Sequence, residues 1–203
     1  PTILRRQRQM CIRDSNEKGL SYVSTSSKNK SILHINFLKG SLGWRIKRSE
    51  HESSLKKAIG KHSHQLTIFD ATAGQLNDSM IFLSLGHKVV AVEQSKILYL
   101  LVSDAIKRAG DELPILDNLK FINGNSIEIF KKDNNQYDLI YLDPIYPIVK
   151  KNVKRSGNLN CIKEILSFEN LMSHGDNLIA DFMNLEYKKI ILKRPLKSKN
   201  NYS

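Results

Sequence analysis

Carboxylates follow several apolar segments that are typical of buried strands. Leu66-Thr-Ile-Phe-Asp70 leads into the small-residue turn Ala71-Thr-Ala-Gly74, and Lys88-Val-Val-Ala-Val-Glu93 ends on a second acid. A third segment, Tyr137-Asp-Leu-Ile-Tyr-Leu-Asp143, ends on an aspartate just before a proline. In open α/β sheets, ligands bind beyond the carboxyl ends of the strands. We therefore expect these carboxylates to meet at one ligand-binding edge of a sheet.

The turn Asp143-Pro144-Ile145-Tyr146-Pro147 is the most informative of these strand ends. It combines a carboxylate, a rigid turn that presents backbone carbonyls, and an aromatic face. An exocyclic amine of a base could donate to Asp143 and to the Pro144 carbonyl while Tyr146 stacks on the ring. Methyl transfer to such an amine relies on positioning and desolvation, not on a nucleophilic side chain. We predict Asp143, Pro144 and Tyr146 as catalytic residues; a proline-rich strand exit without function is the alternative.

The other strand ends suit a nucleoside cofactor, and we predict S-adenosylmethionine (AdoMet). Gly74 permits close approach to a helix N-terminus, but three glycines would be needed for a dinucleotide fingerprint, which argues against a nicotinamide cofactor. Glu93 is placed to bind both ribose hydroxyls. Asn125 and Ser126 could contact adenine, and Asp78 an ammonium group. Helix capping by Ser126 and a favourable helix dipole at Asp78 are equally good explanations of those two residues.

The chain is strongly basic, with a formal net charge of +12 over 203 residues. Such a charge favours an anionic partner, nucleic acid first, although it could serve solubility alone. Phosphate contacts from basic residues near the strand ends would position an RNA without reading its sequence; solvated charge is the alternative. The candidates are Lys150, Lys151, Lys154 and Arg155 after the proline turn, and Lys193 and Arg194 after the last strand.

Several classes of protein and site are not indicated by the sequence. Cys11 and Cys161 lie far apart with no C-x-x-C spacing, and the histidines have no metal-ligand spacing beyond His62-Ser-His64. Neither a disulfide framework nor a metal site is therefore predicted. No apolar run approaches the roughly 20 residues that span a bilayer, and no signal peptide is evident. We expect a cytoplasmic monomer that binds neither metal nor membrane.

Strand-like apolar runs alternate with helical periodicity along most of the chain, which is the pattern of parallel βαβ units. We predict an α/β fold with a Rossmann-like doubly wound sheet. The expected strands are residues 66–71, 88–93, 119–122, 137–143 and 189–193, and the expected helices are residues 77–85, 95–110, 126–132, 158–166 and 176–185.

The N-terminal part is expected to stand apart from this sheet. Residues 1–30 are predicted to be disordered or foreign, because the first fifteen carry four arginines without a periodic apolar face and the next fifteen are rich in Ser, Lys and Asn. Order is expected to begin near Ile32. Residues 31–60 would form a small appendage, with a strand at 32–38, a turn at 40–43 before a basic stretch, and a helix at 49–60. Residues 61–203 would form the catalytic domain.

Taken in order, these motifs resemble the bacterial small-subunit (16S) rRNA guanine-N2 methyltransferase J family, which has the class I AdoMet-dependent methyltransferase fold. The likeness spans roughly residues 35–195. The motifs are Asp70-Ala-Thr-Ala-Gly74, Leu83-Ser-Leu-Gly86, Val92-Glu93, Tyr141-Leu-Asp143-Pro-Ile-Tyr-Pro147 with the lysines after it, and Leu192-Lys-Arg-Pro195. The resemblance implies methylation of the N2 amine of a guanosine, with 16S rRNA or the small ribosomal subunit as partner. It implies AdoMet contacts at Asn77, Asp78, Glu93, Gln94, Asn125, Ser126 and Asp143.

Two features depart from the family pattern. Leu76 and Asn77 stand where the family has a second glycine and an arginine, so contacts to the methionine end should differ. The chain also stops shortly after its fifth strand, where the fold normally adds a hairpin; an open apolar edge is an aggregation hazard, so we expect a truncated sequence. The alternatives are an amino-methyltransferase acting on adenine or cytosine of DNA or RNA, a non-catalytic RNA-binding relative, and an inactive fragment.

Overall fold

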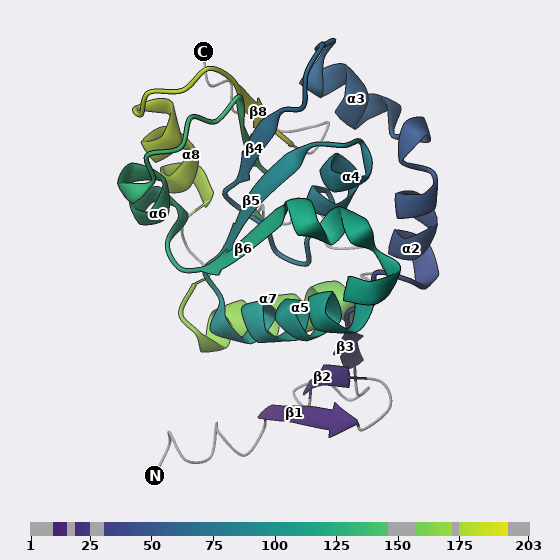
Figure 1. Ribbon diagram of the computed structural model, residues 1–203. Helices are drawn as coiled ribbons and strands as arrows, with labels where there is room; N and C mark the ends of the chain where they lie inside the picture. Colours follow the sequence, from purple (N-terminus) through teal and green to yellow (C-terminus); the bar gives the residue numbers. More distant parts are fainter. Residues whose placement is uncertain (1–9, 16–18, 25–30, 146–156, 172–174, 195–203) are drawn as a thin grey trace.

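The computed structural model describes residues 10–15, 19–24, 31–145, 157–171 and 175–194 (Figure 1). Its larger sheet has five parallel strands in the order β6-β5-β4-β7-β8. The chain moves outward from β4 in one direction and then crosses to β7 on the other side, so strand order reverses between β4 and β7. This is a doubly wound sheet, as predicted. The strands are β4 (Thr67–Asp70), β5 (Lys88–Glu93), β6 (Leu119–Asn123), β7 (Leu139–Leu142) and β8 (Ile190–Leu192).

Helices cover both faces of this sheet. On one face, Ile68, Ala91 and Tyr141 pack with α4, α5 and α7; on the other, Phe69 and Val90 pack with α6 and α8. Successive strand residues thus enter different cores, which is why these strands read as continuous apolar runs and not as alternating ones. The helices are α2 (Gly40–Lys47), α3 (Ser53–Ile59), α4 (Ser79–Ser84), α5 (Lys96–Ala109), α6 (Ser126–Lys132), α7 (Gly157–Phe168) and α8 (Gly175–Met183), with 3₁₀ turns η1 (Ser49–His51), η2 (Gly110–Glu112) and η3 (Pro114–Asn118).

The longest helix, α5, begins where the sequence predicts and has the predicted buried face. Ser95 is the N-cap of α5, and its side chain accepts a hydrogen bond from the backbone N–H of Leu98 at 3.0 Å. Leu98, Leu101, Val102 and Ala105 recur at helical spacing, and all are buried. Every strand and helix predicted between residues 66 and 193 is present, with bounds that differ by a few residues at most.

The N-terminal region differs from its prediction. β1 (Met10–Ser15), β2 (Gly19–Ser24) and β3 (Ser31–His34) form an antiparallel three-stranded sheet beside α5 and α7 (Figure 1). Tyr22 and Leu33 are fully buried in the core that α5 and α7 share. The expectation that order begins near Ile32 is therefore wrong, because Tyr22 gains its burial from distant helices. The division of the chain into three units remains a prediction.

A second difference is α2, where a turn and a basic stretch were expected. The side chain of Asn36 accepts hydrogen bonds from the backbone N–H groups of Leu38 and Lys39 just before the helix. A Cβ on Gly43 would lie 2.6 Å from the backbone of Leu38, so this glycine permits close packing of the helix and does not make a turn. The helix expected at residues 49–60 is split into η1 and α3.

Candidate active site

The turn that follows β4 joins the carboxyl ends of the two neighbouring strands. Thr72 Oγ1 accepts a hydrogen bond from the backbone N–H of Asp143 at 2.7 Å. Two residues on, the backbone N–H of Gly74 donates to Glu93 Oε2 at 2.8 Å. Ala73 N–H donates to the carbonyl of Val92 as well. One short turn therefore holds both the Glu93 and the Asp143 strand ends at the same edge of the sheet.

Glu93 is a buried carboxylate that still has acceptor capacity. Only 8% of the residue is exposed, and Oε1 accepts from the backbone N–H of Ser95 at 2.7 Å while Oε2 accepts from Gly74. Burial raises the pKa of Glu93 to about 7, against the lowering effect of these two hydrogen bonds. An ionised carboxylate offers about four lone-pair sites, so roughly two remain for a ligand. The neighbouring Gln94 is exposed.

Two further carboxylates lie beside this turn. Asp70 accepts from Ser79 Oγ at 2.5 Å and from the Thr72 backbone N–H at 3.0 Å. Burial above all, with a smaller contribution from the nearby acids Asp78 and Asp143, raises the pKa of Asp70 to about 6 against these hydrogen bonds. The loss of hydration is thus the main electrostatic cost at Asp70.

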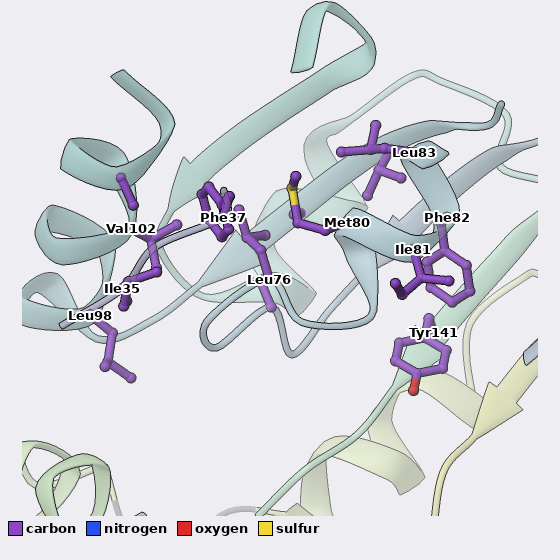
Figure 2. Packing of buried hydrophobic residues seen from close by; sticks show 14 of the residues in the cluster. Ile35, Phe37, Leu76, Met80, Ile81, Phe82, Leu83, Leu98, Val102 and Tyr141 are labelled. Atoms are coloured by element: carbon purple, nitrogen blue, oxygen red, sulfur yellow. The ribbon is translucent and has the colours of Figure 1, made fainter. Parts of the chain in front are cut away.

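Asp78 accepts hydrogen bonds from three side chains. Tyr141 Oη lies at 2.7 Å, Lys193 Nζ at 2.6 Å and an Arg45 guanidinium nitrogen at 3.3 Å. Burial alone would raise the pKa of Asp78, but hydrogen bonds from Lys193 and Tyr141 outweigh it and hold the pKa below its usual value. The ring of Tyr141 also packs on Phe82, with ring centroids 5.0 Å apart (Figure 2). Asp78 therefore carries a stabilised negative charge.

Lys193 lies between two of the acids. Its Nζ is 2.6 Å from Asp78 Oδ2 and 2.8 Å from Asp143 Oδ2. Burial raises the pKa of Asp143 above its usual value, while Lys193 opposes that rise. We predicted Lys193 as an RNA contact. The structure places its ammonium group at the acidic cluster formed by Asp70, Asp78 and Asp143, and the RNA role remains a prediction.

The remaining predicted residues are distributed around the same edge or lie outside the described residues. Asn125 follows β6 and is the N-cap of α6, accepting from the N–H groups of Ile127 and Glu128, so it performs the capping that we considered for Ser126. Asn77 and Arg194 are exposed, and Pro144 is buried. Outside the described residues are Tyr146, Lys150, Lys151, Lys154 and Arg155.

The helix after β4 begins later than expected. Residues 71–78 form turns, and α4 begins at Ser79 instead of Asn77. Leu76 has a left-handed backbone with φ of 60° and is fully buried (Figure 2). A left-handed residue interrupts a right-handed helix, so α4 begins only after Leu76. The backbone N–H groups just after Gly74 therefore belong to a turn and not to the start of a helix.

Sequence reasoning missed several residues that build this edge. Arg45 pairs with both Glu52 and Asp78 from α2, and its basic stretch had been assigned no role. Glu169 accepts hydrogen bonds from Ser95 Oγ and Lys96 N–H, which anchors the start of α5 behind Glu93. Neither residue has a local signal, because each acts on an element far away in the sequence. Tyr141 could have been found, since a phenol in a buried strand usually has a polar partner.

The described residues also form a hollow at the opposite edge of the sheet, away from the carboxylates. A hollow of about 690 Å³ is lined by His62, Leu66, Asp138 and Lys189, among others, and these residues lie at the amino ends of the strands, opposite the carboxylates. The described parts of the chain contain no group of three or more His, Cys, Asp or Glu side chains placed for a metal ion. They contain no helix that is long and apolar enough to cross a membrane.

Comparison with known proteins agrees with this geometry. The family described as "Putative SAM-dependent methyltransferase" matches residues 3–201 of the chain, N-terminal strands included. A protein of Desulfotalea psychrophila named "Ribosomal RNA small subunit methyltransferase J" is 32% identical over 185 residues, which cover 87% of this chain and 70% of the relative.

The chain belongs to this methyltransferase family. A protein of the same name from Shewanella denitrificans is 31% identical over 79% of this chain and 66% of its own length. The crystal structure of a SAM-dependent methyltransferase from Neisseria gonorrhoeae covers 89% of this chain and 70% of its own, with a TM-score of 0.62 and 24% identity. That likeness supports the class I fold. The family resemblance and AdoMet dependence predicted from the sequence are thus confirmed.

Proposed function

We propose that this methyltransferase transfers a methyl group from AdoMet to the exocyclic N2 amine of a guanosine in 16S rRNA. One observation carries the proposal: Glu93 and Asp143 are held by the same turn, Thr72 through Gly74. The proposed cofactor site and the proposed amine-binding turn are therefore adjacent. The names of the relatives, which refer to small-subunit ribosomal RNA, support the choice of substrate.

The residues at the carboxyl edge fit AdoMet. Glu93 has free acceptor sites for two ribose hydroxyls, as a diol requires. Asp70, Asp78 and Asp143 supply carboxylate acceptors at this edge, two of them shared with Lys193, and such acceptors suit the sulfonium and ammonium cations of AdoMet. When bound, AdoMet supplies the electrophilic methyl group. The remaining residues proposed to contact it are Gly74, Asn77, Gln94, Asn125 and Ser126.

Asp143 and Pro144 are proposed to orient the guanine amine. The Asp143 carboxylate and the Pro144 carbonyl would each accept one amine N–H, which fixes the nitrogen for transfer. Lys193 opposes the rise in the pKa of Asp143, so it favours the ionised carboxylate that can accept a hydrogen bond. Stacking of the base on Tyr146 remains a prediction.

The basic residues are proposed to hold the RNA. Phosphate contacts fix the position of a nucleic acid and supply much of its affinity. We assign this role to Lys150, Lys151, Lys154, Arg155 and Arg194, with Lys193 shared between RNA and the acidic cluster. We propose that the protein is a cytoplasmic monomer and that its substrate is either 16S rRNA or the small ribosomal subunit.

Asp143→Ala tests the amine-binding role. We expect transfer of labelled methyl from AdoMet to 16S rRNA to be lost even at saturating AdoMet, because the carboxylate that accepts the amine N–H is gone; the AdoMet affinity from calorimetry separates a loss of cofactor binding from a loss of amine orientation. Asp181→Ala, at an exposed aspartate of α8, is the matched control and should transfer at the normal rate. Undiminished transfer by Asp143→Ala would remove the proposed role.

A further inference from the structure

Helix α2, whose Arg45 pairs with Asp78, also carries an exposed aromatic residue. Gly43 and Ile46 face the core, whereas Trp44, the chain's only tryptophan, is 59% exposed. Large exposed apolar side chains often mark binding surfaces when they lie close together with unpaired charges. Trp44 is accompanied by two basic side chains, Lys47 and Arg48.

The surroundings of Trp44 are basic. The guanidinium carbon of Arg48 lies 4.8 Å from the centroid of the Trp44 ring, one helical turn along, and Lys47 is exposed on the same side. Neither Arg48 nor Lys47 has an ion pair among the described residues. The nearest acids in sequence are already neutralised, since Glu50 pairs with Lys56 and Glu52 with Arg45. The positive charge on this surface is therefore uncompensated.

An exposed indole beneath a guanidinium, with free cations around it, matches the chemistry of an unpaired nucleotide. The base has a π-face that stacks on an indole or a guanidinium, and the phosphate is attracted by lysine and arginine. Single-stranded nucleic acid is recognised by this combination of stacking platform and positive groove. An apolar peptide would use the ring but would leave the cations without partners.

Arg45, the residue that follows Trp44, connects this part of α2 to the proposed active site. Its guanidinium group lies 3.3 Å from Asp78, and Lys193 contacts both Asp78 and Asp143. Helix α2 also packs on α4, which follows the turn that holds Glu93 (Figure 1). A nucleotide near the target base could thus contact α2 while the target lies at Asp143.

We propose that Trp44 and Arg48 form a stacking site for an unpaired nucleotide that flanks the target base in the substrate RNA. The inference rests on the proposed function for the identity of the RNA, but not for the chemistry of the site. Lys47 supplies a phosphate contact. The surface adds affinity for single-stranded RNA and takes no part in the methyl transfer itself.

The single tryptophan makes the test direct. A 12-nucleotide single-stranded RNA added to the full chain in 0.1 M salt should quench Trp44 fluorescence, and the same sequence as a duplex should quench it less. In anisotropy with labelled oligonucleotide, Trp44→Ala should weaken binding by roughly 5- to 150-fold, the range for loss of one stacked base. Trp44→Phe should restore most of it, and Arg48→Ala should weaken it. Tyr187→Ala removes another exposed aromatic and should bind normally.

The possible results distinguish a failure of the stacking site from a failure of the proposed methyl transfer. Equal RNA affinity of the wild type and Trp44→Ala would overturn the stacking site. Unchanged fluorescence with RNA, together with a concentration-dependent spectral shift of the protein alone, would overturn it in favour of self-association. Quenching without any methyl transfer to rRNA would leave the stacking site in place and contradict the proposed function instead.

Discussion

The Lys193 ammonium group lies 2.8 Å from the carboxylate of Asp143, although 50 residues separate them in sequence. The same nitrogen also contacts Asp78, which is a further 65 positions away from Asp143 along the chain. The end of β8 thus supplies a cation to an acidic cluster that β4 and β7 build. Because burial raises the pKa of Asp143, this cation helps to keep Asp143 ionised.

Replacing Lys193 by methionine should change the pH dependence of methyl transfer. Without the ammonium group the pKa of Asp143 rises further, so the acid limb of the rate profile should move to higher pH. Lys193 also pairs with the buried Asp78, so the loss of stability should exceed that of an exposed ion pair and be about 1–3 kcal/mol. A rate measurement from pH 5 to 9 checks the shift.

Lys188→Met is the matched control for this substitution. Lys188 also pairs with an aspartate, Asp138, and is also exposed, but it lies at the amino ends of the strands. Its loss should leave the pH profile unchanged. An unmoved profile for Lys193→Met would show that Lys193 does not set the ionisation of Asp143.

AdoMet affinity should depend on the ionisation of Glu93. Its pKa is raised to about 7, so below that pH the carboxyl is protonated and offers fewer acceptor sites to the ribose hydroxyls. Calorimetry should therefore show weaker AdoMet binding as the pH falls from 8 to 6. Glu93→Gln should bind weakly at all pH values, while Glu128→Gln, at an exposed glutamate of α6, should behave as wild type. Wild-type affinity that stays constant through pH 7 would contradict the role of Glu93.

The left-handed conformation of Leu76 predicts an unusual order of mutant stabilities. Leu76→Ala removes a buried side chain, at a cost of about 2–5 kcal/mol, and keeps left-handed strain of about 1–2 kcal/mol. Leu76→Gly removes that strain, so it should be no less stable than Leu76→Ala in denaturant unfolding. Leu83 is buried in α4, and there glycine should be less stable than alanine by about 1 kcal/mol. The same order at both positions would refute the strain at Leu76.

Asp70 should make stability fall as the pH rises from 4 to 7. Its folded-state pKa of about 6 lies above the ordinary value of 3.8, so the folded chain retains a proton that the unfolded chain has released. This contribution is complete below about pH 4 and is lost as the pH passes 6. The free energy of unfolding of the wild type, relative to Asp70→Asn, should decrease over that range in denaturant titrations. A constant difference would mean that Asp70 has an ordinary pKa.

The sheet could be predicted because its signals are local. The run from Lys88 to Glu93 is apolar, and Ser95 directly after it caps a helix with regular apolar spacing. Tyr22 and Gly43 were misinterpreted for a different reason. The burial of Tyr22 depends on α5 and α7, and the role of Gly43 depends on the backbone of Leu38, so neither is visible in the neighbouring sequence.

The positions of the acidic residues were also predictable, but their partners were not. Parallel strands bring their carboxyl ends to one edge, which places Asp70, Glu93 and Asp143 together. A lysine or arginine can pair with any acid within reach, and the choice depends on the folded arrangement. The contacts of Lys193 and Arg45 with Asp78 therefore required the structure.

The identity of the methylated nucleoside tests the central claim most directly. We predict that 16S rRNA incubated with the chain and labelled AdoMet, then digested and separated by mass spectrometry, yields N2-methylguanosine as the labelled product. The label should disappear with Asp143→Ala. Label found on adenosine or cytidine, or no label transferred by a chain that binds AdoMet, would contradict the account.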